Sequence, residues 1–128
     1  SFAGRLADRF AQLAFAFDTI AAHEQALATP LIDLLKSKRN VHIIGLATAD
    51  RSRRMPTIAF TVDGRKSDEI TLAVDRHRIA IRHGDFYAAR LIDSLGLRER
   101  SGVVRASFVH YNTLDEVNRL VAVLDGIL

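Results

Sequence analysis

The chain of 128 residues contains no cysteine, no tryptophan, one methionine and only two prolines. Without cysteine, neither a disulfide scaffold nor a cysteine-ligated zinc site can form. No apolar run approaches the ~20 residues that are needed to cross a bilayer. These absences predict a cytoplasmic protein with no membrane contact.

Lysine and glycine are also sparse. The chain has three lysines. Lys36 and Lys38 lie at the polar C-terminal end of a predicted helix, and Lys66 lies in a predicted turn. None lies in an apolar pocket that would activate an amine. The seven glycines are scattered through turns and form no glycine-rich loop of the kind that holds phosphate groups. We therefore expect neither a reactive lysine nor a phosphate loop in this chain.

The histidines are not spaced as metal ligands. No pair among them has the His-x₃-His or Glu-x-x-His spacing that places two ligands on one helix face. His23, beside Glu24 on a predicted helix, is typical of a surface or interface residue. No metal site is expected at any of the five positions, which are His23, His42, His77, His83 and His110.

The composition predicts one domain with a core of its own. Hydrophobic residues make up 48% of the chain, and a chain of this length buries roughly two-thirds of its unfolded surface. The net charge is +3, and the only dense basic cluster is Arg51, Arg53 and Arg54. No aromatic residue accompanies the cluster, so a solvated loop, or a face that meets another domain, is favoured over a nucleic-acid site.

A long amphipathic helix is predicted over residues 1–37, because apolar residues recur there at steps of three, four or seven. Pro30 follows Thr29, so the segment is either one kinked helix or two helices with Thr29 as the N-cap. The stripe is long for so small a domain. Its early phenylalanines are expected to bury against another domain or subunit, and otherwise to form an exposed apolar patch; they are Phe2, Phe10, Phe15 and Phe17.

Residues 41–128 alternate strand and helix patterns. Strands are predicted at 41–45, 56–62, 79–82 and from 103, and helices from about Ser67, at 88–95 and over 114–124. Helices between strands predict an α/β fold, a small two-layer sandwich with helices on one face of a mixed sheet of about four strands.

The strand from Val103 carries one arginine. Val104, Ala106 and Phe108 would face one side of the sheet, and Arg105 and Ser107 the other. Thr113 and Glu116 then form a capping box that begins the last helix. An arginine in an apolar strand needs a carboxylate or phosphate partner. The partner is either a ligand or an internal Asp or Glu, unless the side chain extends to solvent from an edge strand.

The segment from Arg82 to Tyr87 is a second candidate site. Its glycine, Gly84, allows the backbone to approach a ligand closely, and His83 and Tyr87 can both move protons. The structural alternative is a turn glycine beside an exposed histidine and a core tyrosine.

Four segments stand out together. In chain order they are His23-Glu24-Gln-Ala-Leu27, Arg54-Met-Pro56-Thr57-Ile-Ala-Phe60-Thr, Ile79-Ala-Ile-Arg82-His-Gly84-Asp-Phe-Tyr87-Ala and Arg105-Ala-Ser-Phe-Val-His-Tyr111-Asn-Thr-Leu-Asp-Glu116. In sequence and in order they resemble segments of class V aminotransferases and cysteine desulfurase-like enzymes, which use pyridoxal phosphate. The resemblance spans residues 20–128 and covers the small C-terminal domain of those enzymes, so the large cofactor-binding domain is missing.

The resemblance implies how the chain takes part in catalysis. Arg105 would bind the α-carboxylate of an amino-acid substrate, while Arg82 and the active-site loop with His83, Gly84 and Tyr87 would line the mouth of the cofactor site. The Schiff-base lysine of the family has no counterpart here. The parent protein is expected to be a pyridoxal-phosphate-dependent transferase or lyase, and the fragment alone is expected to bind no cofactor and to catalyse nothing.

Tyr87 departs from the cysteine desulfurase pattern. The resemblance places it where those enzymes have their nucleophilic cysteine. A phenol cannot take up sulfur as a thiolate does, so desulfurase activity by that route is not expected.

The sequence therefore favours the C-terminal domain of a pyridoxal-phosphate enzyme that works as a homodimer, with the large domain of the same chain as partner. The alternative is a stand-alone α/β module for ligand binding or dimerisation, with Arg105 in a structural ion pair. Nothing in the sequence chooses among transamination, elimination and sulfur transfer, names the substrate, or assigns roles to Arg51, Arg53 and Arg54.

Overall fold

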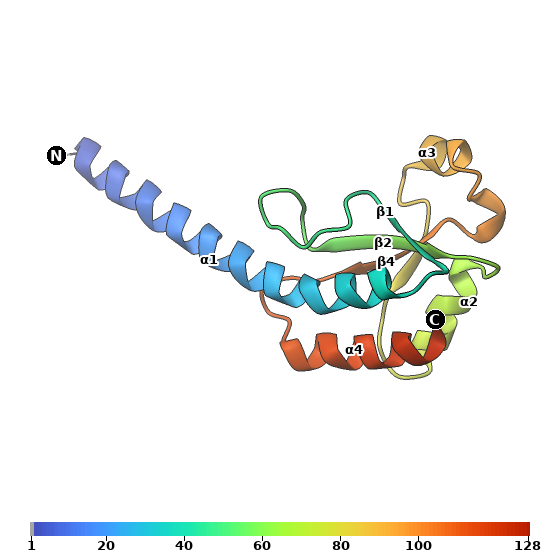
Figure 1. Ribbon diagram of the computed structural model, residues 1–128. Helices are drawn as coiled ribbons and strands as arrows, with labels where there is room; N and C mark the ends of the chain where they lie inside the picture. The colour runs from blue at the N-terminus through green and yellow to red at the C-terminus, as the bar shows by residue number, and fades with distance from the viewer. Residues whose placement is uncertain (1) are drawn as a thin grey trace.

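The computed structural model describes residues 2–128, with side chains from residue 8 onward. In chain order the elements are α1 (Phe2–Ser37), β1 (Val41–Ile44), β2 (Thr57–Val62), α2 (Ser67–Asp75), β3 (Arg82–Gly84), α3 (Ala89–Ser94), the 3₁₀ turn η1 (Arg98–Arg100), β4 (Val103–Ser107) and α4 (Leu114–Ile127). The four strands form one sheet, and α1, α2 and α4 cover one of its faces (Figure 1). The predicted two-layer α/β sandwich is confirmed.

The sheet has the strand order β1-β2-β4-β3, and every adjacent pair is antiparallel. The expected number of strands is correct, but the described sheet is antiparallel rather than mixed. The physical reason lies in where β4 enters. Strands β2 and β3 run in the same direction on either side of the α2 crossover, and β4 inserts between them, so no parallel neighbours result.

The main core lies between the sheet and the three covering helices. Alternate residues of β2 and β4 are fully or almost fully buried there, at Ile58, Phe60, Val62, Val104 and Ala106. The helices contribute Leu27, Leu31, Leu35, Ile70, Val74, Val117, Leu120 and Leu124. Burial of this kind is the main stabilising term of a small domain. This core joins residues from α1, α2 and α4 to residues from the sheet.

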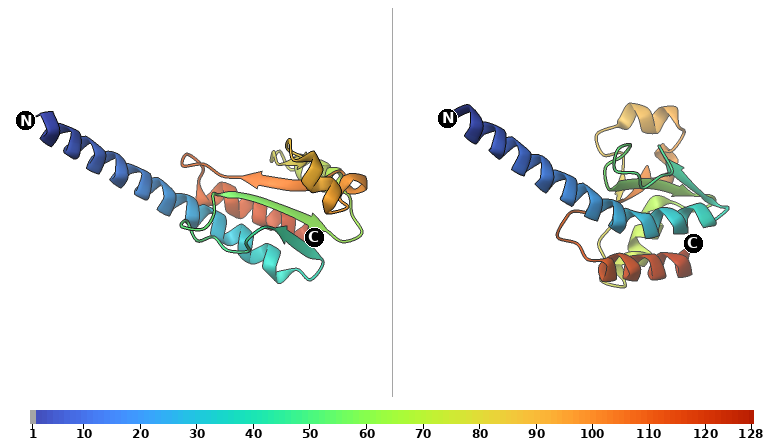
Figure 2. Two further views of the ribbon diagram at one scale, coloured as in Figure 1. Left: turned by 90° about the horizontal axis from the view of Figure 1, so that it is seen from above. Right: turned by 60° about the vertical axis from the view of Figure 1, so that its left-hand side comes forward.

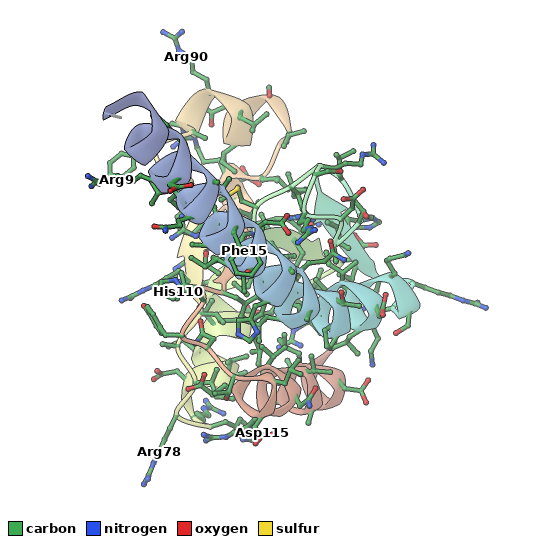
Figure 3. The ribbon with its side chains drawn as sticks, turned by 90° about the vertical axis from the view of Figure 1, so that its left-hand side faces the viewer. Arg9, Phe15, Arg78, Arg90, His110 and Asp115 are labelled. Atoms are coloured by element: carbon green, nitrogen blue, oxygen red, sulfur yellow. The ribbon has the colours of Figure 1, made fainter. Side chains whose placement is uncertain are left out.

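Helix α1 runs without a break through Pro30, so one long helix forms rather than two. Its second half packs on the sheet, and its first half projects beyond it (Figures 1 and 2). The rings of Phe10 and Phe15 on the projecting half are 69% and 75% exposed, and Phe15 is labelled in Figure 3. The ring of Phe17 is exposed as well, so apolar side chains face solvent on α1 as expected, while the side chain of Phe2 lies outside those that the structure describes. Within residues 2–128, no helix is long and apolar enough to span a membrane.

The third strand differs from the prediction. The pattern indicates residues 79–82, whereas β3 is Arg82–Gly84. Residues 79–81 diverge from β4 instead of pairing with it. They line a hollow of about 260 Å³ with Ala106, Ser107 and Phe108. Alternation in a sequence identifies extended backbone, but a strand forms only where a neighbouring strand supplies hydrogen bonds.

Helix α4 begins as predicted. The Thr113 hydroxyl accepts a hydrogen bond from the Glu116 backbone N–H at 3.3 Å, and the Glu116 carboxylate accepts one from the Thr113 N–H at 2.9 Å. The Thr113 N–H is the largest cause of a pKa of Glu116 below its usual value. This capping box fixes the residue at which α4 begins.

Candidate functional site

Arg82 and Arg105 lie directly opposite each other on adjacent strands. Arg105 on β4 pairs with Arg82 on β3 and with Ala59 on β2. The neighbours Val104 and Ala106 point into the main core, so Arg105 projects from the other face of the sheet, as the alternation predicts. Arg82 shares that face, because residues opposite each other in a sheet point the same way.

The arginine pair has no acidic partner among residues 8–128. Ion pairs form elsewhere, such as Lys38–Asp125 at 2.7 Å and His42–Asp63 at 2.9 Å, but none involves either arginine. Like charges directly opposite each other destabilise a sheet, and Arg105 is half-buried. Arg90 on the nearby α3 extends away from the body of the protein (Figure 3). Arg82 and Arg105 therefore place two positive charges side by side, which an anion would neutralise.

An aromatic ring covers Arg105. The guanidinium carbon of Arg105 lies 3.9 Å from the centroid of the Phe86 ring. Phe86 is held in turn by a second, smaller apolar cluster on this face of the sheet, made by Ile92, Leu97 and Val103. Sequence reasoning did not single out Phe86, and nothing in the sequence signals the stack, because it depends on how the loop after β3 folds.

That loop holds two consecutive residues in the left-handed region. Phe86 has φ +50° and Tyr87 has φ +65°, a conformation that side chains larger than glycine seldom adopt. Asp85 stabilises the turn, since its carboxylate accepts the Tyr87 N–H at 3.1 Å and its carbonyl accepts the Ala88 N–H at 2.8 Å. The result points Phe86 back over the sheet and leaves Tyr87 fully exposed.

His83 lies on the opposite face of the sheet from the two arginines. It is the cross-strand partner of core-facing Val104, and its Nδ1 is 2.7 Å from the hydroxyl of Thr71 on α2. The Thr71 hydroxyl donates to the Asp68 carbonyl at 2.9 Å. That hydroxyl has one proton, so His83 Nδ1 is the donor to it. His83 therefore ties β3 to α2 and does not face the arginine pair.

Two glycines allow β3 and β4 to meet. A Cβ built on Gly102 would lie 2.2 Å from the carbonyl oxygen of Gly84, far inside van der Waals contact. Gly102 also has φ +72°, and its carbonyl accepts a hydrogen bond from the Ser67 hydroxyl at 3.0 Å. Gly102 thus sets the approach of β3, and with it the position of Arg82.

The basic cluster between β1 and β2 has a structural role. Arg54 donates to the Thr57 carbonyl at 2.6 Å, and burial lowers its pKa. Arg51 forms an ion pair with Asp18 of α1 at 3.1 Å. These two residues fasten the loop to its surroundings, and Arg53 is exposed.

The lysines and histidines are spread over separate elements of the described structure. Lys36 lies in the last turn of α1 and Lys38 follows that helix, while Lys66 occupies the N-cap position of α2. His23 Nε2 contacts the Asn112 carbonyl at 3.0 Å, and His42 pairs with Asp63. No group of three metal-ligating side chains occurs between residues 8 and 128.

Most of the chain is similar to proteins of one known family. Residues 5–120 match the family model of class V aminotransferases. The chain is 43% identical over 114 residues to the aminotransferase-like protein FGM3 of Gibberella zeae. The matched region covers 88% of this chain and 28% of that protein. It is 37% identical over 115 residues to the cysteine desulfurase-like protein ustD of Aspergillus flavus, again 88% of this chain and 26% of the relative.

Solved structures agree with these relatives. The apo cysteine desulfurase of Thermococcus onnurineus superposes with a TM-score of 0.72 at 27% identity, covering 84% of this chain and 26% of that one. The cysteine desulfurase CsdA of Escherichia coli gives a TM-score of 0.67 at 27% identity, over 82% and 24% of the two chains. The chain thus spans about a quarter of the length of the proteins it matches.

Proposed function

Because this chain belongs to the class V aminotransferase family, we propose that it is the C-terminal domain of a longer pyridoxal-phosphate enzyme and supplies the arginine that binds the substrate carboxylate. The observation that carries the proposal is the pair of Arg82 and Arg105. The two lie opposite each other on one sheet face, with no acidic partner in the described residues. A planar guanidinium binds a carboxylate through two parallel hydrogen bonds.

The cofactor itself needs residues from outside this chain. The family implies pyridoxal phosphate in the full-length proteins, where the cofactor stabilises negative charge on the reacting carbon of the substrate. The three lysines of this chain lie at or beside helix ends, and we expect the Schiff-base lysine to come from the rest of the protein. What this chain contributes is the binding and orientation of a carboxylate, which is an established source of rate enhancement.

The remainder of the protein also explains the projecting half of α1. Its phenylalanines are exposed, and the relatives are more than three times as long as this chain. The occupant we assign to this surface is the large domain of the same chain. The homodimer implied by the resemblance stays a prediction.

A pair of substrates tests the proposed function. The full-length protein is expected to turn over an amino acid with a kcat/KM at least 30-fold higher than that of the matching amine, which lacks only the α-carboxylate. Losing one partner of a desolvated charge pair costs roughly 2–5 kcal/mol, which corresponds to such a ratio or more. Steady-state kinetics on both substrates give the result. Equal kcat/KM values for the two would rule out a carboxylate-binding role.

A second prediction concerns sulfur transfer. With cysteine as substrate, the full-length protein is expected to form little persulfide, because exposed Tyr87 occupies the loop position where the resemblance expects a thiol. Cyanolysis of the protein after incubation with cysteine measures bound persulfide. The matched variant Tyr87→Cys should raise that yield, since a thiolate can accept sulfur. Abundant persulfide on the parent, carried by no cysteine elsewhere in the full-length chain, would contradict the prediction.

A further inference from the structure

The Phe86 ring lies over the guanidinium of Arg105. Among the described residues, no hydrogen bond or ion pair holds the Arg105 side chain. An arginine has four rotatable side-chain bonds, so a half-buried guanidinium without partners would sample many orientations. The ring at 3.9 Å limits that freedom by covering one face of the guanidinium.

Phe86 is itself fixed from two sides. Its ring packs against the cluster of Ile92, Leu97 and Val103, which lies between α3, η1 and β4. Its backbone is held at φ +50° by the Asp85 turn, and this backbone directs the ring toward β4 instead of toward solvent. A strained conformation that persists in a loop is a mark of a functional constraint, because the surrounding contacts must maintain it.

The stack leaves the binding edges of Arg105 available. A ring over the face of a guanidinium does not use its N–H groups, which point outward in the guanidinium plane. Arg82 lies alongside from β3 and adds positive charge on the same face. A carboxylate that arrives in the guanidinium plane therefore meets two N–H donors that are already oriented.

We infer that Phe86 is a positioning residue for substrate binding, which holds the Arg105 guanidinium in the orientation that receives the substrate carboxylate. The inference rests on the proposed function and adds to it a residue that acts through Arg105 without touching the substrate. It predicts that the aromatic face of residue 86, rather than its apolar volume, matters for binding.

The first test measures the stack without cofactor or substrate. In the 128-residue chain, the Nε–H signal of Arg105 is assigned by its loss in Arg105→Lys. The face of the Phe86 ring is expected to move this signal upfield of the signals of exposed arginines. In Phe86→Leu it should return to their range, and in Phe86→Tyr it should stay shifted. An Arg105 signal that is unaffected by Phe86→Leu overturns the inference.

The second test measures the consequence for the full-length enzyme. Phe86→Leu is expected to raise KM for the amino-acid substrate by about 3- to 30-fold with little change in kcat, the range that one cation–π contact supplies. Phe86→Tyr should restore the original KM. Leu91→Ala, which removes a half-exposed apolar side chain from neighbouring α3, is the matched control and should leave KM unchanged.

The outcomes separate the inference from the proposed function. If Arg105→Ala impairs the enzyme but Phe86→Leu does not, the positioning role is overturned and the carboxylate-binding role of Arg105 stands. If Arg105→Ala has no effect either, the proposed function is overturned, and the role of Phe86 with it. Equal effects of Phe86→Leu and Phe86→Tyr on KM would mean that the aromatic face of residue 86 does not orient Arg105, and the inference would be overturned.

Discussion

Replacing Arg105 by alanine in the full-length protein is expected to lower kcat/KM for amino-acid substrates, while the cofactor spectrum stays unchanged. The loss of transition-state stabilisation should be roughly 2–5 kcal/mol. The cost is that of removing one partner from a desolvated pair between guanidinium and carboxylate. Arg105→Lys should recover only part of the loss, because the ammonium keeps the charge but not the planar pair of donors. Steady-state kinetics on the three proteins measure these differences.

The same substitution should cost little folding stability. A structural ion pair would leave a buried carboxylate without its partner, at about 3–5 kcal/mol. Arg105 has no such partner in the described residues, so the substitution removes the contact with Phe86, at about 0.5–1 kcal/mol, and also relieves the repulsion from Arg82. Urea denaturation of the 128-residue chain measures this term. Exposed Arg39→Ala removes the same charge elsewhere and serves as the control. A loss of several kcal/mol for Arg105→Ala alone would return Arg105 to a structural role.

The sequence could predict those parts of the site that depend on local patterns. Alternation along β4 placed Arg105 on the face opposite Val104 and Ala106, and the capping box at Thr113 and Glu116 forms as expected. Both features follow from the backbone geometry of a single element, which a short stretch of sequence specifies.

The parts that could not be predicted depend on contacts between elements. Residues 79–82 alternate like a strand, but the pairing with β4 begins only at Arg82. Because β3 continues to Gly84, strand alternation places His83 on the opposite face of the sheet from Arg82. The predicted strand ends at residue 82, and in a loop the sequence does not fix the face to which the His83 side chain points. The contact between Phe86 and Arg105 needs two consecutive left-handed residues, for which Phe86 and Tyr87 give no signal.

Gly102 also belongs to this second group, and Gly102→Ala is expected to have the largest effect on stability of the substitutions considered. Gly102 and Gly64 have almost the same backbone, with φ +72° and +71°. They differ in their surroundings, because a Cβ at Gly64 would meet nothing within 4 Å, and one at Gly102 would lie 2.2 Å from the Gly84 carbonyl oxygen. Comparing the two alanine variants therefore separates backbone strain from the collision.

Gly64→Ala should lose about 1–2 kcal/mol of unfolding free energy, the cost of a left-handed alanine. Gly102→Ala should lose roughly 1–3 kcal/mol more, as in other overpacked sites, because the atom in the way is backbone and only a shift of β3 can relieve the contact. Urea denaturation of both 128-residue variants measures the difference, and equal losses would show that β3 and β4 do not approach so closely. Since Arg82 moves with β3, Gly102→Ala in the full-length enzyme should also lower kcat/KM. Gly64 lies in the turn after β2 and contacts neither arginine strand through an added Cβ, so Gly64→Ala should leave kcat/KM unchanged.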